Sequence, residues 1–346
     1  MATPALLERR VELNELGRAM RSARAGAGRV VVVTGTAGTG KTALLEEARR
    51  RWSAHRLRAS CSELERGLGF GAARQLLEPA LRALSVPRQR ELFAEIPDRA
   101  RQVLTGSGVA SLDGAEATVA LFQLLVRLSS DGPVLLTVDD AQWADAPSLR
   151  WLHYVHARAS ELPILILVAV RSTVHPELPD DMCFPGARRV GLRPLSVDAI
   201  ARLARVRLDV TVDRVFVRRC ARLTGGIPLY LSALLDEVAA GAAPPDTVDL
   251  DAISSATITS GVRRRLAALP PAATRYAEAL SVLETRHWLD VAREMAALDT
   301  DEAVQSWSVL VDQGLLTNRT DSGFVHPIVL SSIRDSLVPS RRMQLH

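Results

Sequence analysis

The chain has 346 residues, 47% hydrophobic and 24% charged, with 43 basic and 39 acidic side chains and a formal charge of +4. This length and composition exclude collagen-like, disordered and disulfide-scaffold proteins and leave room for two or three domains with cores of their own. Lys41 is the only lysine, and the other 42 basic residues are arginine. Short arginine runs at 49–51 and 263–265 are interpreted as solvated helix faces rather than nucleic-acid contacts.

The apolar runs are short, and 164–170 is among the longest, whereas a membrane-spanning helix needs roughly 20 residues. The opening residues, MATPALLERRVEL, lack the basic start, apolar core and cleavage site of a secretory leader. We therefore expect a cytoplasmic protein without a membrane partner. The three cysteines have neither metal-site nor redox spacing and are interpreted as buried thiols: Cys61, Cys183 and Cys220.

In chain order, a short helix is followed by a predicted strand at 30–34 (VVVVT), whose β-branched run is typical of a strand buried on both faces. A glycine-rich loop then leads into a predicted helix at 41–52. Further apolar runs at 133–138 and 162–170, and a weaker one at 188–192, alternate with segments of helical pattern. This alternation predicts an α/β fold with a doubly wound parallel sheet.

From Ser196 the pattern becomes helical, with a serine cap, and another helix is predicted to begin near Pro228. Residues 239–251, rich in Ala, Pro and Asp, are interpreted as a linker. Beyond it the pattern predicts helices near 259–268, 272–283, 287–297 and 300–313, then two short segments at 315–318 and 323–326 that could form a hairpin. Helices followed by a small hairpin suggest a winged helix. The expected domains are an α/β domain at 1–195, a small helical domain with its linker at 196–251, and a winged-helix domain at 252–346.

The residues around the lone lysine predict a phosphate-binding loop. Residues 35–42, GTAGTGKT, fit the pattern G-x-x-x-x-G-K-[ST] between a predicted strand and a predicted helix. Glycines allow a tight turn that aims backbone N–H groups at phosphate oxygens, and the helix N-terminus adds its positive dipole end. The expected nucleotide ligands are Gly35, Thr36, Ala37, Gly38, Thr39, Gly40, Lys41, Thr42 and Ala43.

Lys41 is expected to bind the β- and γ-phosphates, and Thr42 to offer its hydroxyl to Mg²⁺. The planar guanidinium of arginine is a poor substitute for a compact ammonium inside a tight phosphate cradle. This accounts for lysine at this position in a chain that otherwise uses arginine throughout.

A second acidic element is expected to complete the Mg²⁺ site. Residues 135–140 (LLTVDD) end an apolar strand with Asp139, expected to hold Mg²⁺ directly or through water, and Asp140, expected to polarise the attacking water. Because strand segments intervene, around 57–61, the loop and the carboxylates are predicted to lie on non-adjacent strands, as in the ATPase branch of P-loop proteins. Arg171, at the carboxyl end of a strand, is expected to sense the γ-phosphate, the alternative being a solvated strand-end arginine.

Other candidates for chemistry are weak. His153 and His156 have no nearby carboxylate or cysteine that would complete a zinc site. Four tryptophans are interpreted as packing residues rather than base-stacking platforms: Trp143, Trp151, Trp288 and Trp307.

Together these residues resemble the STAND class of signalling ATPases, and within it the large ATP-binding LuxR-type transcriptional regulators. The resemblance covers almost the whole chain and rests on five segments: 6–13 (LLERRVEL), 62–79, 139–145 (DDAQWAD), 224–230 (TGGIPLY) and 324–327 (FVHP). In the first segment Arg10 stands where the family usually has an acidic residue. The resemblance implies a nucleotide contact for Arg9, packing of Pro228 near the adenine, and contact of His326 with the β-phosphate of ADP.

By this resemblance the chain is a nucleotide-binding oligomerisation module, closed with ADP and self-associating with ATP, with hydrolysis at most a slow reset. Family members continue into helical-repeat sensor arms and a DNA-binding helix-turn-helix, neither of which is visible here, so we expect a piece of a longer protein. One alternative is an AAA+-type motor or loader that acts on DNA with continuous turnover. Another, small-molecule phosphotransfer, lacks a recognisable substrate lid.

Overall fold

A computed structural model of the chain describes residues 6–62, 65–94, 98–105, 114–171, 184–241, 250, 266–267, 269–283, 289–313, 315–316, 324 and 327–337. The chain divides into two compact units, one of residues 1–35, 41–172 and 177–192, the other of residues 36–40, 173–176 and 193–346. Within the described ranges, no helix combines the length and the apolar character needed to cross a membrane.

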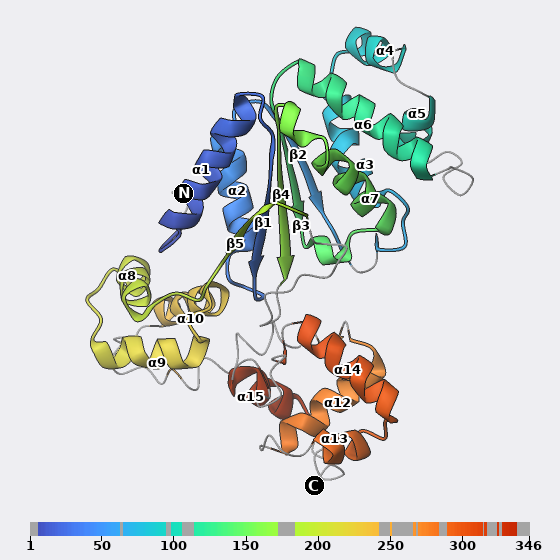
Figure 1. The fold of residues 1–346 in the computed structure, drawn as a ribbon. Coiled ribbons are helices and arrows are strands. Elements are labelled where there is room, and N and C mark those ends of the chain that lie inside the picture. The colour runs from blue at the N-terminus through green and yellow to red at the C-terminus, as the bar shows by residue number, and fades with distance from the viewer. Residues whose placement is uncertain are drawn as a thin grey trace. The chain divides into compact units, whose positions relative to one another are not determined.

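The described part of the first unit is built on a parallel five-stranded sheet in the order β2-β3-β4-β1-β5 (Figure 1). The strands are β1 (Arg29–Gly35), β2 (His55–Ser60), β3 (Val134–Asp139), β4 (Ile164–Arg171) and β5 (Arg188–Gly191). The predicted parallel sheet is confirmed. The loop strand β1 and the carboxylate strand β3 are also non-adjacent, as predicted, but the strand between them is β4, whereas β2 lies at the sheet edge.

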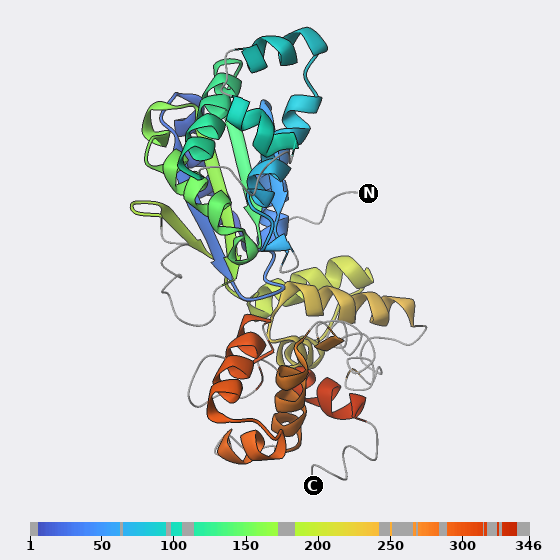
Figure 2. The ribbon, with the colours of Figure 1, turned by 90° about the vertical axis from the view of Figure 1, so that its right-hand side faces the viewer.

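Helices cover both faces of this sheet (Figures 1 and 2). α1 (Arg10–Arg24) and α2 (Lys41–Arg51) share one core with Val31 and Val33 of β1, whereas Val30 and Val32 belong to the core on the opposite face. The helices on that opposite side are α3 (Gly71–Arg82), α4 (Val86–Ala94), α5 (Asp98–Thr105), α6 (Gly114–Ser130) and α7 (Ala146–His156). Two short 3₁₀ turns, η3 (Ala141–Trp143) and η4 (Ala159–Glu161), follow β3 and α7 in the chain. Because β3 and β4 are buried on both faces, their sequences are continuous apolar runs.

The described part of the second unit is mostly helical. Its helices are α8 (Val197–Leu208), α9 (Arg214–Thr224), α10 (Pro228–Ala240), α12 (Pro271–Val282), α13 (Leu289–Met295), α14 (Thr300–Asp312) and α15 (Pro327–Ser336). The serine cap is confirmed, since the hydroxyl of Ser196 accepts a hydrogen bond from the N–H of Ala199 at 3.2 Å. A helix begins at Pro228, as predicted, and α9 is an addition to the helices that we predicted individually.

Beyond residue 250 the structure describes only part of what the sequence predicts. The predicted helices 272–283, 287–297 and 300–313 correspond to α12, α13 and α14. Most of the predicted linker and of the helix 259–268 lies outside the described residues, as do the arginine run 263–265, Cys183, Trp288 and His326. Of the hairpin, the structure describes one antiparallel bridge between Leu316 and Phe324. The winged helix therefore stays a prediction.

Several side chains have the surroundings expected of them. Arg49 and Arg51 pair with Glu46 and Glu47 on the surface of α2, at 2.9 and 2.7 Å, which fits a solvated helix face. Cys61 and Cys220 are buried, and burial raises the pKa of each thiol to about 12. Trp151 is fully buried in the core beside the sheet.

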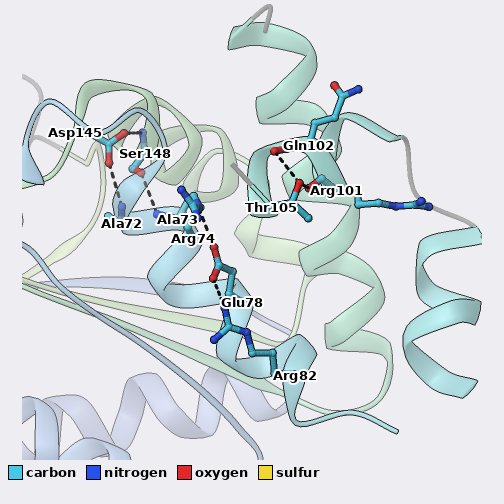
Figure 3. Close-up of polar contacts among 10 residues, drawn as sticks. All are labelled: Ala72, Ala73, Arg74, Glu78, Arg82, Arg101, Gln102, Thr105, Asp145 and Ser148. Carbon is cyan, nitrogen blue, oxygen red and sulfur yellow. Dashed lines mark hydrogen bonds and ion pairs between the residues drawn. The ribbon is translucent and has the colours of Figure 1, made fainter. Parts of the chain in front are cut away.

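Asp145 joins the beginnings of two helices, α3 and α7 (Figure 3). Its Oδ1 accepts hydrogen bonds from the N–H groups of Phe70 and Ser148, at 2.7 and 2.9 Å. Its Oδ2 accepts from the N–H of Ala72 at 3.1 Å, and the neighbouring Ser148 hydroxyl accepts from the N–H of Ala73 at 3.0 Å. One buried carboxylate thus satisfies N–H groups at two helix N-termini and fixes the segment after β2 against the segment after β3.

Replacing Asp145 with alanine should lower the free energy of unfolding by about 2–4 kcal/mol, because three buried N–H groups lose a charged acceptor. The matched control is Glu78→Ala on α3, which removes ion pairs with Arg74 and Arg82, both at 2.8 Å and visible in Figure 3. These pairs lie near the surface, so the control should cost about 1 kcal/mol or less. Urea unfolding measures both variants, and equal losses would contradict the double-cap role of Asp145.

Candidate nucleotide-binding site

The glycine-rich loop connects the end of β1 to the start of α2. Gly38 and Gly40 have φ angles of +80° and +97°, a region that glycine adopts without strain. At Gly38 space is also restrictive, because a Cβ atom would lie 2.9 Å from Ile227 and 3.0 Å from Leu229. Within the second unit, the N–H of Leu229 donates to the carbonyl of Gly38 at 3.2 Å. The loop residues 36–40 are therefore held directly against the start of α10.

The TGGIPL segment shapes that start of α10. Gly226 has a φ of +70°, and a Cβ atom there would lie 2.5 Å from the carbonyl oxygen of Leu195. The N–H of Leu195 donates to the carbonyl of Gly226 at 2.8 Å, which explains why the backbones approach so closely. Pro228 follows at the first position of α10, where a missing N–H costs nothing. These contacts account for glycine and proline in this segment independently of any adenine contact.

The ammonium group of Lys41 is buried at the first position of α2. Lys41 is 6% exposed, and its Nζ donates a hydrogen bond to the carbonyl of Gly35 at 2.8 Å. Burial lowers the pKa of Lys41 to about 8; the charge of Asp140 opposes this change, Arg171 lowers the pKa further, and Asp139 opposes it less strongly. A phosphate oxygen beside this ammonium would favour its charged form, so the site suits an anion.

Thr42 and Asp139 are brought into contact although they lie 97 residues apart. The Thr42 hydroxyl donates to Asp139 Oδ2 at 2.6 Å, and Asp139 Oδ1 accepts from the N–H of Asp140 at 3.0 Å. Asp139 is buried, so both hydrogen bonds fix its carboxylate. A hydroxyl and a carboxylate are oxygen ligands of the type that Mg²⁺ prefers, and this pair fits the metal. When bound there, Mg²⁺ would neutralise charge on the β- and γ-phosphates.

Arg171 and Asp140 form an ion pair at the carboxyl ends of β4 and β3. Arg171 Nε donates to Asp140 Oδ1 at 3.1 Å, and the two side chains are 25% and 32% exposed. In register, Arg171 pairs with Gly35 at the end of β1, so Gly35, the carboxylates and this arginine share one sheet edge. Arg171 is therefore partly buried and ion-paired, and its expected contact with a γ-phosphate stays a prediction.

The remaining predicted ligands have less informative surroundings. Arg9 is buried at the start of α1, lies 3.7 Å from Glu12, and has its pKa lowered mainly by burial. In the loop, the Thr39 hydroxyl donates to the carbonyl of Thr36 at 2.8 Å. Ala37 lies in the loop and Ala43 on the exposed side of the first turn of α2. None of these observations shows whether Arg9 binds nucleotide, so that role stays a prediction.

Two residues with defined contacts were not assigned a role from the sequence. Gln142 hydrogen bonds to Asp140 and to the backbone of Arg171, and Asp145 caps two helices. Both lie in the DDAQWAD segment, where an amide and a carboxylate follow the strand at fixed spacing. Their position directly after the strand could have marked both residues as candidates. Their hydrogen-bond partners could not be read from the sequence, because the tertiary fold brings these partners near.

Comparisons with known proteins agree with this geometry. Residues 5–168 match the family model of the AAA ATPase domain. The chain is 25% identical, over an alignment of 380 residues, to an uncharacterised protein of Rhizobium meliloti (strain 1021), covering 99% of this chain and 36% of that protein. The chain thus spans about a third of the length of this curated relative.

Solved structures are similar over nearly the whole chain. A Walker-type ATPase of Pyrococcus abyssi has a TM-score of 0.63 at 16% identity, covering 94% of this chain and 95% of that one. The ORC1 protein of Aeropyrum pernix, solved in complex with DNA, has a TM-score of 0.56 at 15% identity, covering 95% and 92%. A STAND protein with a tetratricopeptide-repeat sensor from Pyrococcus horikoshii has a TM-score of 0.39 at 16% identity, covering 94% and 42%.

The parallel sheet with β4 between β1 and β3, the glycine loop ending in Lys41, and the family match point to one assignment. Residues 5–168 match an AAA ATPase domain, and the described strands and helices of this region have the P-loop NTPase fold.

Proposed function

We propose that this chain is an ATP- and ADP-binding switch of a transcriptional regulator of the large ATP-binding LuxR type within the STAND class. ADP holds a closed monomer, ATP opens it and permits self-association, and slow hydrolysis resets it. The observation that carries the proposal is the convergence of Lys41, the Thr42–Asp139 pair and the Arg171–Asp140 pair on the edge formed by β3, β4 and β1. The regulator assignment is drawn from the family resemblance.

In this proposal each residue of the edge has a separate task. Lys41 attracts the β- and γ-phosphates, while Thr42 and Asp139 hold Mg²⁺. The guanidinium of Arg171 leaves Asp140 and binds the γ-phosphate, and Asp140 is then free to orient a water molecule. The water oxygen bonds to the γ-phosphorus, the bond to the β–γ bridging oxygen breaks with its electron pair on ADP, and the water proton leaves with inorganic phosphate. Aspartate is shorter than the glutamate common in fast ATPases, which supports a slow reset.

Nucleotides shift a two-state equilibrium only by their differential affinity for the two states, and a complete reversal requires about 5.5 kcal/mol. His326, by resemblance, contributes to this difference by contacting the β-phosphate of ADP in the closed state. DNA contact is proposed for a C-terminal helix-turn-helix of the kind that the family resemblance implies.

An AAA+-type ATPase that acts on DNA is a second candidate. Its support is the fold similarity to the Aeropyrum pernix ORC1 protein, which extends over 95% of this chain and 92% of that chain. The two candidates differ in turnover, because a motor or loader hydrolyses ATP continuously and DNA accelerates it, whereas a switch turns over slowly.

The mass of the purified chain in solution tests the switch. After the bound nucleotide has been identified by denaturing release and chromatography, light scattering should show a monomer with ADP and a larger species with a non-hydrolysable ATP analogue. Lys41→Ala should remove this dependence. Identical monomer masses with both nucleotides would sink the switch, and rapid turnover stimulated by DNA would favour the second candidate.

Changing Lys41 to methionine should raise the Kd for ATP and ADP about 100-fold or more, because the phosphates lose their buried charged partner. Arginine at this position should fail similarly, since its planar fork does not fit the cradle. Arg51→Met removes the same charge from the exposed end of α2 and should leave Kd unchanged. Binding of a fluorescent ATP analogue measures all three variants, and tight binding by Lys41→Met would refute the assigned role.

The pKa of Lys41 predicts a pH dependence of nucleotide affinity. Below pH 8 the ammonium is charged and this group leaves affinity unchanged; above pH 8 binding must take up a proton, so Kd should rise by up to about 10-fold per pH unit. The free energy of unfolding of the nucleotide-free chain should change in the opposite direction. The pKa of Lys41 in the folded chain lies below the unfolded value of 10.5, so the contribution of this group to stability rises between pH 8 and 10.5. Calorimetry in buffers of different ionisation enthalpy measures the proton uptake, and none at pH 8.5 would contradict the prediction.

A further inference from the structure

Gln142 links the two strand ends that carry Asp140 and Arg171. Its Nε2 donates to Asp140 Oδ1 at 3.0 Å, and its Oε1 accepts from the backbone N–H of Arg171 at 3.1 Å. The side chain therefore connects the residue after β3 with the last residue of β4. Neither the expected Mg²⁺ ligands nor the expected phosphate ligands include it.

Chemistry fixes which way the amide of Gln142 faces. Only an NH₂ group can donate to the Asp140 carboxylate, and only the carbonyl oxygen can accept from the N–H of Arg171. In the reversed orientation, the NH₂ group would face the N–H of Arg171 and the carbonyl oxygen would face the Asp140 carboxylate, so neither hydrogen bond could form. A glutamine is thus matched to one donor and one acceptor at the same time.

The backbone that carries Gln142 is a rigid turn. η3 is closed by hydrogen bonds from the N–H of Trp143 to Asp140 at 3.0 Å and from the N–H of Ala144 to Ala141 at 2.9 Å. Ala141 is fully buried. Asp140 has φ 49° and ψ 45°, a left-handed conformation that is uncommon outside glycine but that aspartate tolerates better than most residues.

One oxygen of Asp140 receives two donors and the other receives none from the described residues. Arg171 Nε and Gln142 Nε2 both bind Oδ1. Asp140 Oδ1 is thus the oxygen that both donors hold in place. Against the lowering effect of burial, the charge of Asp140 also acts on Lys41 and raises its pKa.

We propose that Gln142 is a positioning residue for ATP hydrolysis, holding Asp140 Oδ1 so that Oδ2 faces the attacking water. This inference rests on the proposed hydrolysis of ATP by the chain. Gln142 binds the backbone of Arg171 rather than its guanidinium, so the amide stays in place when the guanidinium leaves Asp140 for the γ-phosphate. Once that exchange occurs, Gln142 is the described side chain that still holds Asp140.

Single-turnover hydrolysis and equilibrium nucleotide binding by the purified chain test this role with three variants. Gln142→Ala removes both hydrogen bonds, whereas Gln142→Glu keeps an acceptor for the N–H of Arg171 but loses the donor to Asp140. Gln75→Ala is the matched control, because Gln75 also bridges a strand-end N–H, of Ser60 at 2.9 Å, and a carboxylate, of Glu65 at 3.2 Å. Both Gln142 variants should hydrolyse ATP about 10- to 100-fold more slowly with Kd changed less than about 3-fold, and the control should match the wild type.

A double-mutant cycle separates positioning from general stability. Gln142→Ala should add no further loss in an Asp140→Ala background, since the amide acts through that carboxylate. A wild-type hydrolysis rate for Gln142→Glu would overturn the proposal, because the hydrogen bond from the N–H of Arg171 would then be sufficient without the one to Asp140. If Gln142→Ala fails to fold, the result for Gln142→Glu decides the question. Equal losses in affinity and rate would also overturn it. If the wild-type chain binds nucleotide but does not hydrolyse it, both the slow reset and the role of Gln142 are refuted. A mass that depends on the nucleotide would still support the switch.

Discussion

The pairing of β4 with both β1 and β3 is the constraint on which the site depends. Parallel strands end at the same edge, so this order brings Gly35 at the end of β1, the carboxylates at the end of β3 and Arg171 of β4 together. Segments separated by about a hundred residues then become hydrogen-bonding neighbours, as Thr42 and Asp139 show. The burial of β3 and β4 on both faces makes this edge rigid enough to hold charged groups in fixed positions.

Burial of a single ammonium group follows from that architecture. At the start of α2, Lys41 is almost fully enclosed, and loss of water around it lowers its pKa despite two neighbouring carboxylates. An unfavourable buried charge in the free protein becomes a favourable one when phosphate arrives, so some folding stability is exchanged for nucleotide affinity. This exchange explains the one lysine in a chain of arginines better than net charge does.

The sequence was most informative where one local pattern determines the structure. Fully buried parallel strands are continuous apolar runs, so β1, β3 and β4 were predicted nearly to their ends, and Lys41 could be placed by its motif. β2 lies at the sheet edge and alternates exposed arginines with buried residues, which weakened its signal. The partners of Gln142 and Asp145 could not be predicted, because each contacts residues that only the tertiary fold brings near. The order of the strands is a tertiary property of the same kind.

The Arg171–Asp140 pair sets a limit on what this edge contributes to switching. Both side chains are about a quarter to a third exposed, so breaking the pair costs on the order of 1 kcal/mol. In the proposed switch, ATP would displace this pair to reach the guanidinium, whereas ADP lacks the γ-phosphate and would leave the pair intact. Loss of the pair would therefore offset the new contact between guanidinium and γ-phosphate by a factor of about 5, since 1.4 kcal/mol corresponds to a factor of about 10. A complete reversal requires about 5.5 kcal/mol. A contribution of this size is small beside that requirement, so in the proposed switch most of the switching free energy would come from contacts outside the β3–β4–β1 edge, and the proposed role of the edge is to recognise the γ-phosphate and release Asp140 for hydrolysis.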